Sequence, residues 1–127
     1  MKKILIFFSL IYIFSCTKNN EEDFFDSQFE TECDNNDVYY ISSDPSKSIS
    51  NIITNKCLGC HFKNSGIVDF ETYEDLILVT NLIYRINLDS NDPLVMPQAG
   101  YPQLTDCEIS QLTSWVNNGS LYDEAQR

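Results

Sequence analysis

The chain has 127 residues and a formal net charge of −11, from 8 basic and 19 acidic side chains. A chain of this length is typical of one small domain. The acidic balance excludes binding to nucleic acid, or to anionic lipid by charge, because both require a basic surface. It suits a partner with a basic patch, but the acids are spread widely, which favours plain solubility.

The first fifteen residues have the composition of a secretory signal peptide. Met1-Lys2-Lys3 forms a basic head, and Ile4 to Phe14 is an apolar run of eleven residues that only Ser9 interrupts. Such a run is too short to span a bilayer, which takes about 20 residues. The alternative of a buried N-terminal helix is disfavoured, because the run has no amphipathic period.

Ile13-Phe14-Ser15-Cys16 resembles a bacterial lipobox, in which the signal is cut before the cysteine and the cysteine carries lipid. We expect residues 1–15 to be removed and Cys16 to anchor the protein to a membrane. The alternative is ordinary cleavage that leaves a free thiol in an oxidising compartment. Removal of residues 1–15 would leave six basic and nineteen acidic side chains, a formal charge of −13.

Residues 16–32 are polar and acidic, and we expect them to form a flexible tether. Residues 33–127 are then the folded domain. A domain of this size buries a limited core and usually needs covalent staples or a cofactor.

Three helices are predicted in the first part of this domain, at residues 46–56, 72–79 and 81–88. Thr72 or Glu71 is expected to start the second helix. The apolar residues expected to face the core are Ile49, Ile52 and Ile53 in the first, Tyr73, Leu76, Ile77 and Val79 in the second, and Leu82, Ile83 and Ile86 in the third.

The last part is predicted to be a loop followed by a helix. Three prolines and a glycine make residues 93–104 irregular. Thr105 and Glu108 have the spacing of a capping box, and Asn118-Gly119 that of a left-handed helix stop. The inner stripe of this helix is predicted to be Ile109, Leu112, Trp115 and Val116.

The stretch NKCLGCHFKN, residues 55–64, carries Cys57, Cys60 and His61, and His61 is the sole histidine of the chain. Thiol–disulfide exchange is one interpretation. Such a motif normally lies at the start of a helix in a βαβ unit, whereas this one lies at the end of a predicted helix. Zinc is a second reading, which would need Cys33 and Cys107 to complete four ligands. Covalent haem is the third, because C-x-x-C-H is the attachment signature of c-type haem.

Haem explains the spacing best. Residues three and four apart share one face of a helical turn, so Cys57 and Cys60 can reach two vinyl groups along one haem edge. His61 then lies under the iron as its axial ligand. The expected signal peptide agrees with this, because haem of this type is attached outside the cytoplasm.

A sixth iron ligand is expected in the Pro- and Gly-rich loop. Once Met1 is removed, Met96 is the one methionine left, 35 residues after His61 in the stretch VMPQAG at 95–100. A methionine on such a loop has little helical face to fill, so we expect its thioether to bind iron rather than to pack in the core.

These pieces together resemble a class I c-type cytochrome, and more narrowly the small single-haem cytochrome lipoproteins of Gram-negative bacteria. The matching stretches are CLGCH at 57–61, VMPQAG at 95–100 and LTDCEISQLTSWVNNGS at 104–120. The resemblance covers most of residues 33–120. It implies an all-α fold of about four helices and long loops around one haem c, held by Cys57 and Cys60, with His61 and Met96 as axial ligands.

The resemblance also implies that Trp115 packs near the haem and that Cys33 pairs with Cys107. Parity agrees with the pairing, because two cysteines remain after Cys16 and the haem pair, although two buried free thiols stay an alternative. A carbonyl in residues 62–70, or near Pro93, should accept the ring N–H of His61. The candidates for the haem propionates or the haem crevice are Tyr73, Tyr84, Arg85 and Tyr101.

The function expected from these features is a membrane-tethered one-electron carrier rather than an enzyme. It would be monomeric and extracytoplasmic, with redox proteins as partners, on the periplasmic side of the outer membrane or the cell surface more than on the inner membrane. One rival is an electron-conduit subunit of a dehydrogenase or peroxidase complex. Others are a haem-based sensor in which Met96 is labile, and a thiol oxidoreductase.

Overall fold

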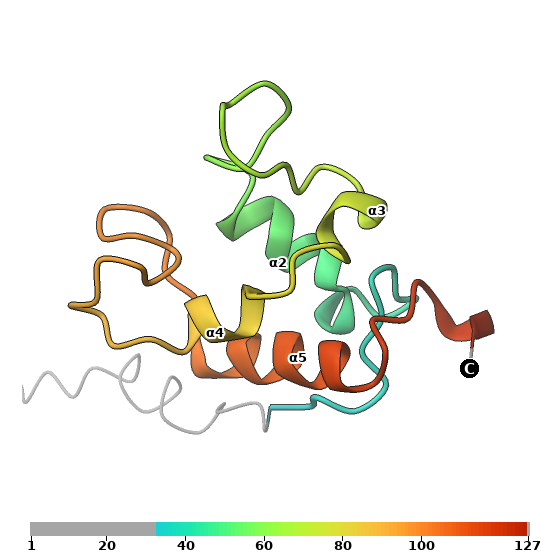
Figure 1. Cartoon of the computed structure of the whole chain (residues 1–127). Coiled ribbons are helices and arrows are strands. Elements are labelled where there is room, and N and C mark those ends of the chain that lie inside the picture. The colour runs from blue at the N-terminus through green and yellow to red at the C-terminus, as the bar shows by residue number, and fades with distance from the viewer. Residues whose placement is uncertain (1–32, 127) are drawn as a thin grey trace, which may run out of the picture. The chain divides into compact units, whose positions relative to one another are not determined.

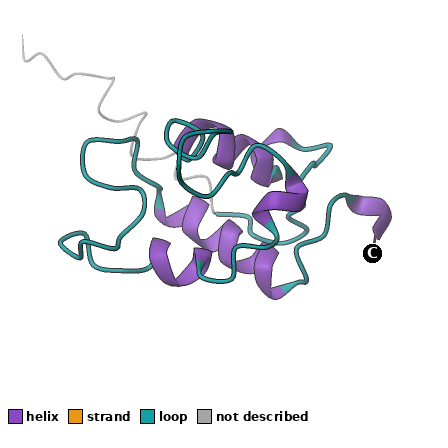
Figure 2. Ribbon diagram, turned by 45° about the horizontal axis from the view of Figure 1, so that its top comes forward, coloured by secondary structure: helices purple, strands orange, loops and turns teal. Residues whose placement is uncertain are grey.

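The computed structural model describes residues 33–126 (Figure 1). The expected signal peptide, the lipid anchor at Cys16 and the tether lie outside the described residues. Helices and loops make up the described chain, without a strand in residues 33–126, so the predicted all-α class is confirmed (Figure 2). The helices are α2 (Ile49–Lys56), α3 (Tyr73–Leu76), α4 (Leu82–Ile86) and α5 (Asp106–Asn117), with 3-10 turns η1 (Pro45–Lys47) and η2 (Glu124–Gln126).

Helix α5 is the base on which the domain is built, because α2 and α4 both pack against it (Figure 1). The core between them is apolar, as helical spacing predicted. Its most deeply buried members are Ile49, Ile53, Leu76, Leu112 and Trp115. None of the helices within residues 33–126 is both long and apolar enough to cross a bilayer.

All three helices predicted before residue 93 are shorter in the structure, and capping explains where the first of them begins. The carboxylate of Asp44 accepts a hydrogen bond from the backbone N–H of Ser46 at 2.9 Å and holds η1, so α2 begins at Ile49 and not at residue 46. Thr72 caps α3 as predicted. Helix α3 ends after one turn, so Ile77 leaves the helical stripe and is 43% exposed, and the prediction that it faces the core is wrong.

The capping box of α5 is confirmed: the Thr105 hydroxyl accepts from the N–H of Glu108, and the Glu108 carboxylate accepts from the N–H of Thr105. Gly119 has a φ of +91° just past the helix, as the Asn-Gly pair predicted. The predicted stripe fails at Val116, which is exposed. Gln111, a polar residue of the same helix, is buried instead.

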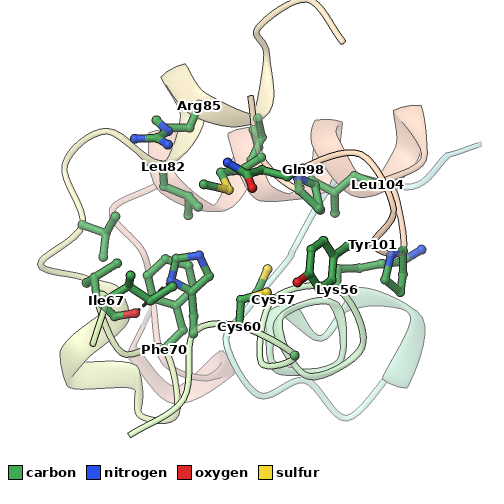
Figure 3. Close-up of a pocket in the computed structure, with 18 of the residues that line it drawn as sticks. Lys56, Cys57, Cys60, Ile67, Phe70, Leu82, Arg85, Gln98, Tyr101 and Leu104 are labelled. Carbon is green, nitrogen blue, oxygen red and sulfur yellow. Dashed lines mark hydrogen bonds between the residues drawn. The ribbon is translucent and has the colours of Figure 1, made fainter. Parts of the chain in front are cut away.

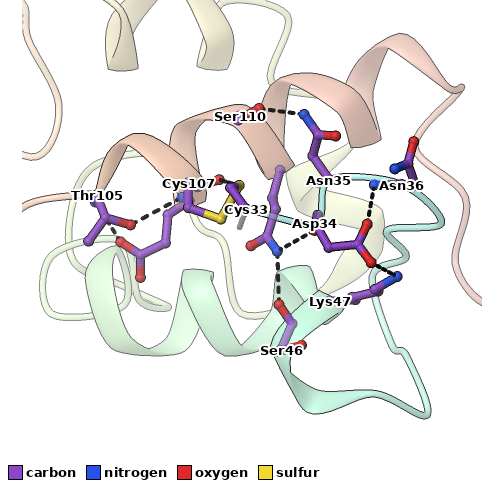
Figure 4. Close-up of a disulfide and its surroundings, with 11 residues drawn as sticks. Cys33, Asp34, Asn35, Asn36, Ser46, Lys47, Thr105, Cys107 and Ser110 are labelled. Atoms are coloured by element: carbon purple, nitrogen blue, oxygen red, sulfur yellow. Dashed lines mark hydrogen bonds and ion pairs between the residues drawn. A yellow bond between two sulfur atoms is a disulfide. The ribbon is translucent and has the colours of Figure 1, made fainter. Parts of the chain in front are cut away.

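Hydrophobic periodicity does not predict the burial of Gln111, because its side chain is polar. Its side-chain amide donates to the carbonyl oxygens of Asp34 at 3.0 Å and Ser46 at 2.9 Å. These two bonds satisfy the buried amide and hold residues 33–36 alongside α5 (Figure 4). Asn35 adds a hydrogen bond to Ser110 of the same helix. The start of the domain is therefore attached along α5 by polar groups, which hydrophobic periodicity cannot detect.

A disulfide joins Cys33 to Cys107 across 74 residues, with a Cα–Cα distance of 5.3 Å (Figure 4). The pairing implied by the family resemblance is thus present, and the alternative of two free thiols is not. Cys107 lies in the first turn of α5. The bond therefore ties the first described residue to the beginning of the helix on which the domain is built.

Candidate functional site

A cavity of about 540 Å³ opens between three parts of the chain (Figure 3). They are the end of α2 with the loop that follows it, the segment around α4, and a strap that we define as residues 95–104. In Figure 3 Leu82, Arg85 and Gln98 border one side of the space, while Cys57, Cys60 and Phe70 border the opposite side. The walls are mainly apolar, and the volume lies in the range of about 300–1,000 Å³ typical of ligand and cofactor pockets.

The two cysteines of the sequence motif reach this cavity from a turn at the end of α2. Cys57 is the C-cap residue of α2, and its carbonyl accepts hydrogen bonds from the N–H groups of Cys60 at 3.1 Å and His61 at 3.0 Å. This turn presents all three side chains to one space, as their spacing predicted. Both thiols are free and half-buried. Burial, with a smaller effect of the Glu108 charge, raises the pKa of Cys57 to about 11.

The imidazole of His61 is held by one hydrogen bond and one ring contact. Its Nδ1 atom lies 2.8 Å from the carbonyl oxygen of Val68. Because a carbonyl can only accept, Nδ1 carries the proton and the lone pair is left on Nε2. The ring of Phe70 stacks on the imidazole, with centroids 4.2 Å apart and planes 5° from parallel. Val68 thus supplies the carbonyl that was expected within residues 62–70.

Met96 lines the same cavity as His61, although 35 residues separate them. Its backbone N–H donates to the carbonyl of Arg85 at 3.1 Å, which attaches the strap to the end of α4. The thioether is half-buried rather than packed in the core. The structure therefore brings together all four side chains that the sequence assigned to the haem.

Two of the four side chains considered for the haem propionates or crevice also line the cavity. The Nε atom of Arg85 is buried and makes no hydrogen bond within the described residues. A buried, unpaired guanidinium nitrogen requires an acceptor, and a carboxylate of a ligand would supply it. Interaction with the nearby thiol of Cys60 raises the pKa of the Tyr101 hydroxyl.

The other aromatic candidates do not line the cavity, and neither does Trp115. The indole N–H of Trp115 donates to the carbonyl of Leu121, and its ring lies against that of Tyr40, 6.4 Å away. Trp115 is fully buried in the core and does not line the cavity, and the expectation that it packs near the haem stays a prediction. Tyr73 also lies against Tyr40 and bonds to Ser120, and Tyr84 is exposed.

The structure argues against the zinc hypothesis, because two of the four ligands that it requires are not free. Cys33 and Cys107 are bonded to each other and cannot complete a tetrahedral set with Cys57 and Cys60. No group of three or more His, Cys, Asp or Glu side chains in residues 33–126 gathers as a metal site.

The cavity therefore offers two thiols, one imidazole with a fixed tautomer, one thioether and one unpaired guanidinium nitrogen around an apolar space. The function is therefore inferred from these side chains and not from similarity to a known protein. No family model, curated protein or solved structure matches the chain.

Proposed function

We propose that this protein is a one-electron carrier that holds one haem c covalently in the cavity. Cys57 and Cys60 would form the thioethers, and His61 and Met96 would be the axial ligands. The observation that carries the proposal is that a single cavity is lined by all four of these side chains.

Three further features of the cavity fit a haem. The apolar walls suit a porphyrin, and the buried Nε of Arg85 suits one of its propionate carboxylates. The tautomer of His61 leaves Nε2 free for iron, and the carbonyl of Val68 fixes the ring, as hydrogen-bond partners of metal-binding histidines do at other sites. On this basis we assign the all-α domain to the class I cytochrome c fold that the sequence resembles.

The haem would supply the Fe(III)/Fe(II) couple, whose potential thioether ligation raises. The residues of the chain would hold and orient this group. His61 is held in one orientation by Val68 and Phe70, and Met96 on the strap would supply the second protein ligand. With His61 and Met96 both bound to the haem iron, the protein would pass electrons rather than activate a small molecule.

The proposal places this domain outside the cytoplasm, tied to a membrane through Cys16 and the acidic tether of residues 16–32. Such a tether confines the search for a redox partner to the membrane surface and raises the effective concentration. In the alternative of a conduit subunit, the same domain would feed electrons to a dehydrogenase or peroxidase, and it would co-purify with that enzyme.

The environment of Cys57 argues against the alternative function of a thiol oxidoreductase. Reactive cysteines have a lowered pKa, because a helix N-terminus or a nearby cation stabilises the thiolate. Cys57 lies at the C-terminal end of α2, and its pKa is raised to about 11. This environment suits a thiol that is consumed in a thioether bond better than one that exchanges disulfides.

The visible absorption spectrum of protein made with a c-type haem maturation system tests the proposal. We expect sharp low-spin bands on reduction and, in the oxidised protein, the weak far-red band of an Fe(III)–thioether bond. A haem-loaded protein that lacks the far-red band or is high-spin would contradict Met96 as a ligand and favour the sensor. A colourless protein with exchangeable Cys57 and Cys60 thiols would overturn the proposal.

A further inference from the structure

The strap that carries Met96 is closed by its own hydrogen bonds. The side-chain amide of Gln103 donates to the carbonyls of Gln98 at 3.0 Å and Tyr101 at 2.8 Å. The N–H of Tyr101 also donates to the carbonyl of Gln98. These contacts give the strap a shape, but they do not hold it to the rest of the domain. Hydrogen bonds at its two ends attach the strap to the rest of the domain.

At one end, the N–H of Met96 bonds to Arg85, as described above. At the other end, the ammonium group of Lys56 donates to the carbonyl of Gln103 at 2.7 Å. Lys56 is the last residue of α2 and directly precedes Cys57. One side chain therefore connects the segment that carries Cys57, Cys60 and His61 to the segment that carries Met96.

The ammonium group of Lys56 is held in place by a carboxylate as well as by the carbonyl of Gln103. Its Nζ lies 3.4 Å from Glu108 Oε2, and the two side chains are only 19% and 22% exposed. The same carboxylate oxygen accepts the N–H of Thr105, which follows the strap. A cation at the C-terminal end of α2 is also favoured by the helix dipole. Lys56 thus lies where α2, the strap and the start of α5 meet.

We infer that Lys56 is a positioning residue: by holding the carbonyl of Gln103, it keeps the strap closed and the Met96 sulfur within reach of the iron. The inference rests on the proposed function. It assigns to Lys56 control of how firmly the second axial ligand is held, and therefore of whether the iron is open to outside ligands. Lys56 does not itself touch the iron.

The chain supplies a matched control in Lys47. Its side chain is also 19% exposed and paired with a carboxylate, that of Asp34 at 2.6 Å, but it does not line the cavity. Lys56→Met and Lys47→Met each keep the aliphatic stem and remove one paired charge. Lys47→Met reports the loss of a paired ammonium group by itself, beside a carboxylate that is more exposed (Asp34, 53%) than Glu108 (22%), whereas only Lys56→Met releases the strap.

The test is made on haem-loaded full-length protein. We measure the far-red band of the oxidised form and the rate at which the reduced form binds carbon monoxide. Lys56→Met should keep its covalent haem but lose most of the far-red band and bind carbon monoxide at least tenfold faster than wild type. Lys56→Arg should restore both properties in part, and Lys47→Met should behave as wild type.

Gln103→Ala provides a second variant that loosens the strap from its own side, by removing the bonds to the carbonyls of Gln98 and Tyr101. It should shift both readouts in the same direction as Lys56→Met. If the wild-type protein shows the far-red band and both variants give wild-type values, the role of Lys56 is overturned but the proposed function is not. A wild-type protein without haem or without the band would overturn the proposed function and this inference together.

Discussion

The Nδ1 atom of His61 and the carbonyl oxygen of Val68 lie 2.8 Å apart, and this contact decides which imidazole nitrogen can bind iron. In the reduced, haem-loaded protein, we therefore expect the Nδ1 proton of His61 to exchange slowly with solvent and to show a nuclear Overhauser effect to Val68. Proton NMR checks this. Phe70→Leu should speed the exchange, because it removes the stacked ring, whereas Phe62→Leu alters an exposed neighbour and should not. Fast exchange in the wild type would contradict the assigned tautomer.

Replacing Met96 by alanine should leave the haem attached and lower the reduction potential, because a thioether ligand favours Fe(II). A fall on the order of 100 mV is expected, within the range of about 0.8 V over which axial ligands set haem potentials. Redox titration measures it. Gln98→Ala changes another strap residue that lines the cavity and should leave the potential near that of the wild type. An unchanged potential in Met96→Ala would mean that another group binds the iron.

Cys57→Ala and Cys60→Ala should each weaken covalent attachment of the haem, and the double variant should abolish it, because the proposed function requires each thiol to form one thioether. Mass spectrometry of the denatured protein reads attachment directly. The double variant Cys33→Ser/Cys107→Ser serves as the control, since these cysteines bond to each other and not to the haem. Normal covalent loading in Cys57→Ala and Cys60→Ala would reject the haem assignment.

Removal of the disulfide should lower stability by a large fraction of the total. The bond closes a loop of 74 residues, for which chain entropy gives about 4 kcal/mol, against about 5–15 kcal/mol for the stability of a typical domain. Denaturant titration of Cys33→Ser/Cys107→Ser with haem bound measures the loss. A midpoint equal to that of the wild type would show that the core and the haem alone hold residues 33–36 against α5.

Leu112 and Val116 test which face of α5 is buried. Leu112 is fully buried and Val116 is 37% exposed. Leu112→Ala should therefore cost about 2–5 kcal/mol of unfolding free energy, whereas Val116→Ala should change it by no more than roughly 0.5 kcal/mol. Thermal or denaturant unfolding compares the two variants. Equal losses would contradict the orientation of α5 in the structure.

Much of this protein follows from residues that are close in the sequence. The capping box at Thr105 and Glu108, the glycine stop at Gly119 and the isoleucines of α2 each depend on contacts within about one helical turn. For the same reason, the spacing of Cys57, Cys60 and His61 was enough to predict that the three side chains face one space. The helix caps, most of the core stripe and the local turn of the Cys-x-x-Cys-His motif are therefore predictable without coordinates, whereas the exposure of Ile77 and Val116 was not.

Only the tertiary structure decided how distant segments meet. Helices α2 and α4 pack on α5, and this packing places the strap with Met96 over the cavity that His61 lines. It also turned Trp115 toward Tyr40 and buried Gln111 on two carbonyls that periodicity could not specify. The choice of Val68 as the partner of His61, and of Gln103 as that of Lys56, has the same origin. A backbone carbonyl is present at every residue, so only the packed chain determines which one a side chain reaches.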